Sequence, residues 1–185
     1  GILKKRILVL DGAMGTMIQK YKFSEEDYRG ERFKDYAHPL QGNNDLLSLT
    51  QPDTIREIHE KFLEVGADII ETNTFSSTSV AMADYHMADL IYELNFESAK
   101  IAVNACKKYT DLNPNKPRFV AGSIGPTNKT ASISPDVNDP GFRAITFDEL
   151  VDSYSEQIEA LIAGGVDILL VETILDRKST RLNSS

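Results

Sequence analysis

The sequence of 185 residues has one cysteine, no tryptophan and three histidines. A single cysteine excludes an intrachain disulfide framework and supplies too few ligands for a structural zinc site. Basic residues are also scarce, because 20 Lys and Arg stand against 28 Asp and Glu, which gives a net charge of −8. A nucleic-acid-binding surface needs a basic stripe, so this balance argues against DNA or RNA as the main partner.

Long apolar runs are missing as well. No run approaches the roughly 18 apolar residues that a membrane-spanning helix needs, so we expect no membrane partner. Gly1–Lys5 leads into a short apolar segment rather than into a signal-peptide pattern, and we expect a cytoplasmic location. With 41% hydrophobic and 26% charged residues, the composition fits one globular domain or part of a larger one.

The rest of the chain is organised around the segment Arg6–Thr16, which reads RILVLDGAMGT. Its four aliphatic residues, Ile7–Leu10, predict a strand that is buried on both faces. Asp11 would then stand at the carboxyl end of a parallel strand, where α/β folds place their functional groups. The alternative is a turn aspartate that caps the next helix, and this segment alone does not decide between the two.

Short apolar segments alternate with helical patterns along the rest of the chain. Strands are predicted within residues 7–10, 67–75, 118–126 and 166–173. Helices are predicted from a Thr50 cap to Gly66, over residues 87–109, and from a capping box at Thr146 to Gly164. This order is typical of a parallel sheet with right-handed crossovers. Residues 127–142 lack periodicity, and we expect a surface loop over the strand ends.

The second and fourth predicted strands open with the same pattern, Gly-x-Asp-Ile. Counted from the glycine, Asn73 takes the place of Glu172, and Glu71 lies two residues earlier on the same side. We therefore expect Asp11, Asn73 and Glu172 to surround one end of the sheet. Glu71 would lie one layer deeper, in a structural role.

Two architectures are compatible with this pattern: half of a (β/α)8 barrel, or part of a doubly wound sheet. No Gly-x-Gly-x-x-Gly follows any predicted strand, which weakens a nucleotide-binding interpretation. A complete barrel needs about 250 residues, and this chain reaches only a fourth strand.

Six motifs carry a family resemblance that extends over about residues 6–176. They are ILVLDGAMGTMI at 7–18, RGERF at 29–33, GNNDLL at 42–47, GADIIETNTF at 66–75, GPTN at 125–128 and TASISPDVNDP at 130–140. Together they resemble the N-terminal homocysteine-binding module of cobalamin-dependent methionine synthase. The Asp-Gly turn and the Glu-Thr end belong to the wider homocysteine S-methyltransferase family, whereas RGERF and SPDVNDP indicate the cobalamin-dependent branch.

The resemblance implies a (β/α)8 TIM barrel, of which residues 1–176 would form the N-terminal half with about four strands. Residues 177–185 are basic and Ser-rich, and we expect them to be a non-native tail. In the family, three cysteines from later strands hold a zinc ion that binds the homocysteine sulfur. A free thiol has a pKa of about 8.5 and is mostly protonated at neutral pH. A metal suits this task because a thiol that binds it loses its proton.

In the complete family member the thiolate takes the methyl group of methylcobalamin to give methionine. Separate modules of the same polypeptide bind the cobalamin and the methyltetrahydrofolate donor. The three zinc-binding cysteines would lie beyond residue 176, and Cys106, which we expect to fill the core, matches none of them. We therefore expect this chain to bind neither zinc nor cobalamin, and to be inactive and prone to aggregation on its own.

The resemblance also assigns binding residues. Asp11 and Glu172 match the family positions that bind the substrate ammonium group. Gly12, Asn73 and Thr74 are placed to approach the amino-acid carboxylate or to orient the two acids. No catalytic residue and no metal ligand are expected in this chain. The alternatives are a homocysteine methyltransferase that uses a small donor, such as betaine or S-methylmethionine, and a non-catalytic remnant that binds amino acids.

Overall fold

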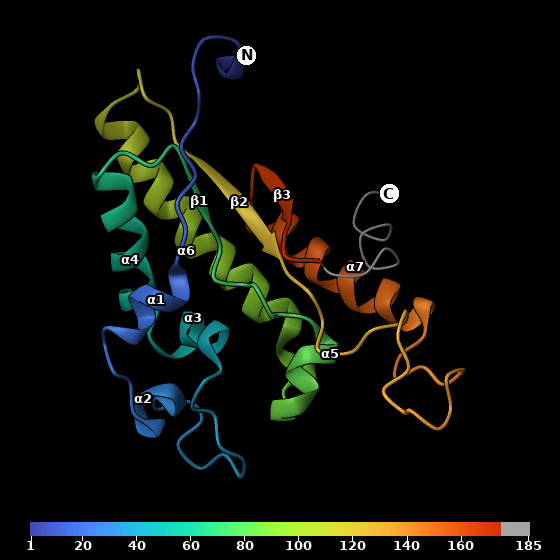
Figure 1. Ribbon diagram of the computed structural model, residues 1–185. Helices are drawn as coiled ribbons and strands as arrows, with labels where there is room; N and C mark the ends of the chain where they lie inside the picture. Colours follow the sequence, from blue (N-terminus) through green and yellow to red (C-terminus); the bar gives the residue numbers. More distant parts are fainter. Residues whose placement is uncertain (175–185) are drawn as a thin grey trace.

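A computed structural model describes residues 1–174 of the chain (Figure 1). The strands are β1 (Ile69–Glu71), β2 (Phe119–Ile124) and β3 (Ile168–Val171). The long helices are α4 (Pro52–Glu64), α6 (Ile91–Leu112) and α7 (Phe147–Gly164). The short helices are α1 (Met14–Gln19), α2 (Glu25–Arg29), α3 (Leu47–Thr50) and α5 (Ser79–Met82). The tail expected at residues 177–185 lies outside the described part of the chain.

The three strands form one parallel sheet in the order β1-β2-β3. Helix α6 connects β1 to β2, and α7 connects β2 to β3, so each crossover is a βαβ unit, as the alternating pattern predicted. The two helices pack closely, because a Cβ at Gly164 would lie only 2.4 Å from the Cβ of Ala99. The α/β class and the parallel sheet are therefore confirmed, with three strands in place of four.

The expectation of a buried strand at Ile7–Leu10 is wrong. This segment makes one isolated parallel bridge, from Leu10 to Ile69, and is not a strand of the sheet. Its side chains are open to solvent, with Ile7 at 89% and Val9 at 57% exposure. The physical reason is its position at the outer edge, where β1 covers one flank and no described strand covers the other.

The helix ends differ from prediction where local hydrogen bonds compete with the sequence signals. Thr50 does not cap α4 but ends α3, where its Oγ1 donates a hydrogen bond to the Leu46 carbonyl. Pro52 does occupy the first turn of α4, after Gln51 as the N-cap. Val65, the C-cap residue of α4, is exposed. The predicted capping box at Thr146 is confirmed.

The repeated Gly-x-Asp-Ile pattern corresponds to a repeated contact. The Asp68 amide donates to the Val9 carbonyl at 2.7 Å, and the Val9 amide donates to Asp68 Oδ2 at 3.0 Å. Asp167 makes the same pair of bonds with Val120, at 2.9 and 2.8 Å. At the amino end of the sheet, Asp68 thus ties the start of β1 to the Ile7–Leu10 segment, and Asp167 ties the start of β3 to β2.

The core consists of three apolar clusters on the helical side of the sheet. One joins α3, α4 and the start of α6, a second lies between α4, α6 and the strands, and a third lies beneath α7. Cys106 is buried in the second cluster, where its Sγ donates to the Phe119 carbonyl, so its predicted role as core filler is confirmed. Among residues 1–174, no helix is long and apolar enough to cross a membrane.

Candidate functional site

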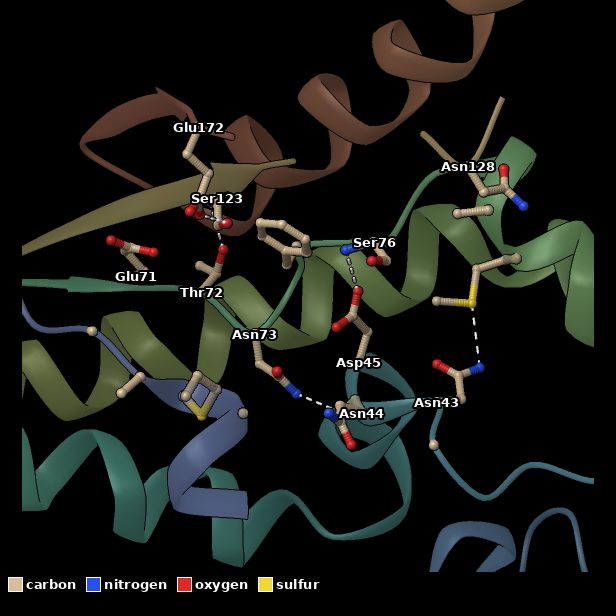
Figure 2. Close-up of a pocket in the computed structure, with 18 of the residues that line it drawn as sticks. Asn43, Asn44, Asp45, Glu71, Thr72, Asn73, Ser76, Ser123, Asn128 and Glu172 are labelled. Carbon is tan, nitrogen blue, oxygen red and sulfur yellow. Dashed lines mark hydrogen bonds between the residues drawn. The ribbon is translucent and has the colours of Figure 1, made fainter. Parts of the chain in front are cut away.

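A pocket of about 450 Å³ lies at the carboxyl end of the sheet (Figure 2). Its walls come from the 11–15 turn, the 42–45 turn, the ends of β1 and β2, the 81–85 segment and Glu172 after β3. Five carboxyl side chains line it, namely Asp11, Asp45, Glu71, Asp84 and Glu172. No Lys, Arg or His from residues 1–174 is among the lining residues, so the pocket is suited to a cationic group.

Asp11 is held by the backbone of β1. Its amide donates to the Ile69 carbonyl at 2.9 Å, and its Oδ1 accepts the Glu71 amide at 2.9 Å. Helix α1 begins instead after Ala13, which makes no side-chain cap, so the helix-cap interpretation of Asp11 is wrong. Burial raises the pKa of Asp11 to about 7, and the nearby charge of Glu172 adds to this effect.

Glu172 follows β3 and meets the end of β2. Its amide donates to the Ile124 carbonyl at 3.1 Å, and its Oε1 accepts a short hydrogen bond from the Ser123 hydroxyl. The structure thus brings Glu172, which follows β3, and Asp11, which follows the segment bridged to β1, to the same pocket from opposite edges of the sheet, as the sequence pattern predicted. Ser123, which orients Glu172, was not singled out from the sequence.

Glu71, which we expected one layer deeper in a structural role, also lines the pocket. Burial raises the pKa of Glu71 to about 8, with smaller contributions from the charges of Glu172 and Asp11. Three acids, rather than the expected two, therefore meet at this end of the pocket.

Of the other predicted residues, Gly12 and Asn73 line the pocket and Thr74 does not. The space beside Gly12 is open, since a Cβ there would meet no atom within 4 Å. Asn73 Nδ2 donates to the Asn44 carbonyl at 2.8 Å and to Ser48 Oγ at 3.2 Å. Thr74 is fully buried, and its Oγ1 donates to the carbonyl of Ser123, the residue whose hydroxyl binds Glu172.

The opposite end of the pocket contains polar residues that the sequence argument left unassigned. Asp45 is buried, and its Oδ2 accepts hydrogen bonds from the Ser76 amide at 2.7 Å and the Ser77 hydroxyl at 2.8 Å. Burial raises its pKa to about 6. Asn128, from the predicted 127–142 loop, donates to Asp84 at 2.6 Å. The unusual density of amide residues in the GNNDLL turn was the available signal for this region.

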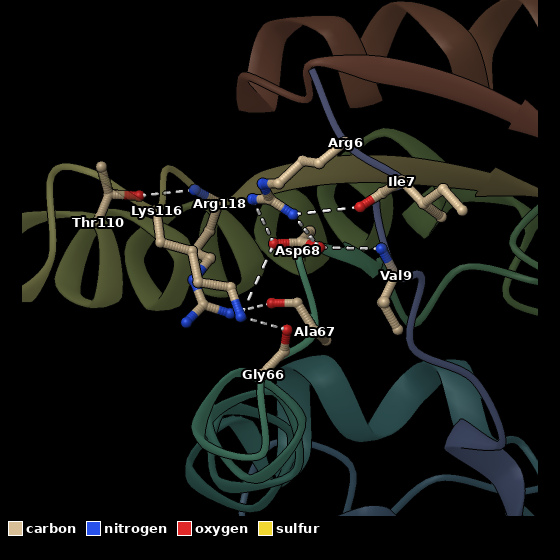
Figure 3. Close-up of polar contacts among 9 residues, drawn as sticks. All are labelled: Arg6, Ile7, Val9, Gly66, Ala67, Asp68, Thr110, Lys116 and Arg118. Carbon is tan, nitrogen blue, oxygen red and sulfur yellow. Dashed lines mark hydrogen bonds and ion pairs between the residues drawn. The ribbon is translucent and has the colours of Figure 1, made fainter. Parts of the chain in front are cut away.

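A second charged group lies at the amino end of the sheet, away from the pocket (Figure 3). Arg6 binds Asp68 at 2.7 Å, and the pKa of Asp68 falls to about 2 mainly because of the hydrogen bonds from Arg6. Lys116 and Arg118 donate to the carbonyls of Gly66 and Ala67. These bonds tie the strand entries together, so we regard this group as structural.

The described residues do not fit the zinc ion that the family resemblance implies. No group of three or more His, Cys, Asp or Glu side chains within residues 1–174 is placed to hold a metal ion. The cysteine is buried in the core, and burial raises the pKa of its thiol to about 12, far from the thiolate that zinc requires.

Comparison with known proteins adds a family and a fold. A family model described as homocysteine S-methyltransferase matches residues 8–183. The fold is similar to that of the homocysteine methyltransferase MmuM from Escherichia coli. In its metallated form the TM-score is 0.73 at 23% identity, with 98% of this chain and 59% of that chain covered. For the oxidized form the TM-score is 0.74 at 24% identity, with 98% of this chain and 58% of that chain covered.

The apo form gives a TM-score of 0.66 at 22% identity, covering 98% of this chain and 55% of that chain. This chain thus spans between 55% and 59% of the length of these structures. Its three-stranded parallel sheet matches part of a homocysteine methyltransferase TIM barrel.

Proposed function

The chain belongs to the homocysteine S-methyltransferase family, and from this premise we propose that its pocket binds homocysteine as the acceptor of a methyl group. The observation that carries this proposal is the pocket itself, which is lined by five acids and by no basic side chain of the described residues. An amino-acid substrate carries an ammonium group, and such a group is the natural partner of partly buried carboxylates.

We assign the ammonium site to Asp11 and Glu172. Both carboxyl groups are anchored by hydrogen bonds from β1 or β2, so each is held in place before a ligand arrives. A cation beside Asp11 would favour its charged form, which burial alone disfavours. Gly12 leaves open space beside the acids, and we assign it to the approach of the amino-acid carboxylate. Asn73 borders the same space and orients the 44–48 turn.

We further propose that the methyl donor is methylcobalamin, delivered by a separate module that also works with a methyltetrahydrofolate-binding module. The support is the sequence resemblance in RGERF and SPDVNDP. Arg32 in the first motif pairs with Glu93, and Arg29 binds the carbonyls of Tyr36 and His38. A small cationic donor, such as betaine or S-methylmethionine, is the alternative that the acidic pocket also favours.

The share of the reaction that we assign to this chain is the binding and orientation of homocysteine. Zinc would supply activation of the sulfur, and the described residues do not fit it, so no step is assigned to the metal here. We expect the 185-residue chain alone to bind the amino acid without transferring a methyl group.

The ammonium site is tested by calorimetric titration of the chain with L-homocysteine and with 4-mercaptobutyrate, which lacks the amino group. A hydrogen-bonded charge pair is worth about 1.5–3 kcal/mol, so we expect the analogue to bind about 10- to 100-fold more weakly. Glu172→Gln should weaken homocysteine to a similar extent and leave the analogue unchanged. Glu97→Gln, an exposed acid of α6, is the matched control. Equal affinity for the two ligands would contradict the assignment.

A further inference from the structure

Asn73 has a side-chain amide whose two hydrogens are both bonded within the protein. The residue is only 4% exposed, and its Nδ2 donates to the Asn44 carbonyl at 2.8 Å and to Ser48 Oγ at 3.2 Å. Figure 2 shows the first of these bonds. A backbone carbonyl can only accept a hydrogen bond, so the nitrogen of the amide must face Asn44. The orientation of the amide is therefore fixed before a ligand arrives.

The oxygen of the same amide is available to the pocket. None of the hydrogen bonds among residues 1–174 reaches Asn73 Oδ1, and this atom is not one of the buried polar atoms that lack a partner. Because Asn73 lines the pocket, its Oδ1 is a fixed acceptor at the pocket surface. With both hydrogens already donated, Asn73 has none left for a ligand carboxylate, which its oxygen would repel.

The two acids assigned to the ammonium group each have one oxygen engaged already. Asp11 Oδ1 accepts the Glu71 amide, and Glu172 Oε1 accepts the Ser123 hydroxyl. A primary ammonium group has three N–H donors. When the remaining oxygen of each acid takes one of them, the third donor has no carboxylate acceptor, and an unsatisfied charged donor in a partly closed pocket weakens binding.

We propose that Asn73 Oδ1 accepts the third ammonium hydrogen, which makes Asn73 a binding residue that selects a primary ammonium group over an N-methylated one. The inference rests on the proposed binding of an amino acid at this site and deepens it by naming the class of amine. Glu71 is the competing acceptor, because it also lines the pocket. Asn73 is favoured because its amide adds an acceptor without adding charge, whereas a third carboxylate would leave two surplus negative charges beside one ammonium group.

L-Methionine and N-methyl-L-methionine test this selection in the unaltered chain, because they differ by one methyl group on the nitrogen and neither has a thiol. The N-methylated ammonium group has two hydrogens, which two carboxylates alone can satisfy. A third acceptor at Asn73 would lose its hydrogen and meet the methyl group. We therefore expect N-methylmethionine to bind about tenfold or more weakly in calorimetric titrations. Affinities within about threefold of each other would overturn the inference and leave the proposed function in place.

Asn73→Ala separates the acceptor from a general role in packing. It removes the third acceptor and opens space for the methyl group, so the ratio of the two affinities should fall to about threefold or less. A loss of packing alone would weaken both ligands and leave the ratio unchanged, which would overturn the inference. Asn104→Ala removes an exposed amide of α6 and is the matched control, in which the ratio should persist. Selection that is lost in Glu71→Gln and kept in Asn73→Ala would identify Glu71 as the third acceptor and overturn the inference.

The orientation of the amide can be measured without a ligand. In the ¹⁵N-labelled chain, the side-chain NH₂ resonances missing from Asn73→Ala identify Asn73. Because both hydrogens are bonded inside the protein, we expect them to exchange with solvent more slowly than those of Asn104. Equally fast exchange would place the nitrogen at the pocket surface and overturn the inference. Failure of both methionine and homocysteine to bind would overturn the proposed function and the inference together, whereas equal affinity for the two methionines overturns the inference alone.

Discussion

At the scale of single residues, His59 has the most unusual environment outside the pocket. It is fully buried on α4, and neither ring nitrogen has a hydrogen-bond partner among the described residues. Burial lowers the pKa of His59 from 6.5 to about 4. The folded protein therefore resists protonation of this ring, and folding stability should fall as the pH drops from about 6.5 toward 4.

We predict that His59 costs about 2 kcal/mol of folding stability between pH 7.5 and pH 5, from the difference between its folded and unfolded pKa values. Urea unfolding of the unaltered chain and of His59→Leu at the two pH values measures this loss. The variant should lose less stability on acidification, because leucine fills a similar volume and does not titrate. His38→Gln, at an exposed histidine, should behave like the unaltered chain. An equal loss in all three proteins would refute the prediction.

Thr74 is buried and does not line the pocket, so its effect on folding stability can be measured separately from its effect on ligand binding. Thr74→Val removes a buried hydroxyl that bonds Thr72 and the Ser123 carbonyl. We expect a loss of about 1–3 kcal/mol in stability, because those partners are left unsatisfied, and no more than about a threefold change in methionine affinity. Chemical denaturation and calorimetry measure the two quantities. A large loss of affinity with unchanged stability would restore Thr74 to the binding site.

At the scale of elements, the contact between α6 and α7 leaves little space for a side chain at Gly164. A Cβ there would approach the Ala99 Cβ to 2.4 Å and the Phe96 carbonyl oxygen to 3.0 Å. Gly164→Ala should therefore destabilise the fold by about 1–3 kcal/mol, even though alanine favours helices by about 1 kcal/mol over glycine. Ser155→Ala places the same residue on the exposed face of α7 and is the matched control. Thermal unfolding distinguishes them, and equal midpoints would mean that the two helices can separate at no cost.

The elements also show which parts of the fold were predictable. Strong local signals, such as the Thr146 capping box and the Gly-x-Asp-Ile pattern, predicted α7 and the entries of β1 and β3 correctly. The error at Thr50 arose because its hydroxyl bonds back to the Leu46 carbonyl, a choice that depends on the preceding turn.

The site was predictable for residues that follow a strand, and less so elsewhere. Asp11, Asn73 and Glu172 meet in the pocket because parallel strands end at one edge of a sheet. Glu71 lines the pocket together with Asn73, two residues further on, as strand alternation predicts, whereas Thr74 is buried. Asp45 comes from a turn more than 20 residues before β1, and only the tertiary structure brings it to the pocket.

At the scale of the whole molecule, the sheet has two edges that no described strand pairs. Ile7 and Val9 are exposed along one edge, and Ile168 and Leu169 are partly exposed at the other. Unpaired strand edges with apolar side chains promote association. We predict that the isolated chain self-associates as its concentration rises, in agreement with its expected tendency to aggregate.

The double substitution Ile7→Lys with Val9→Lys should lower this association, because charge on an edge opposes pairing. Light scattering over a range of concentrations measures the effect. Ile133→Lys with Val137→Lys, in an exposed loop away from both edges, is the control and should leave association unchanged. A chain that stays monomeric throughout the concentration range would contradict the prediction.

The two aspartate contacts at the amino end of the sheet also constrain strand length. Asp68 and Asp167 each fix the pairing of a strand at its start, and the residues that line the pocket follow at set spacings. Counted from each aspartate, the fifth residue further along the chain lines the pocket. It is Asn73 after Asp68 and Glu172 after Asp167. An insertion or deletion of one residue between the aspartate and its pocket residue would leave the anchor intact and turn Asn73 or Glu172 away from the pocket. The number of residues in each strand is therefore as much a part of the binding site as the carboxylates themselves.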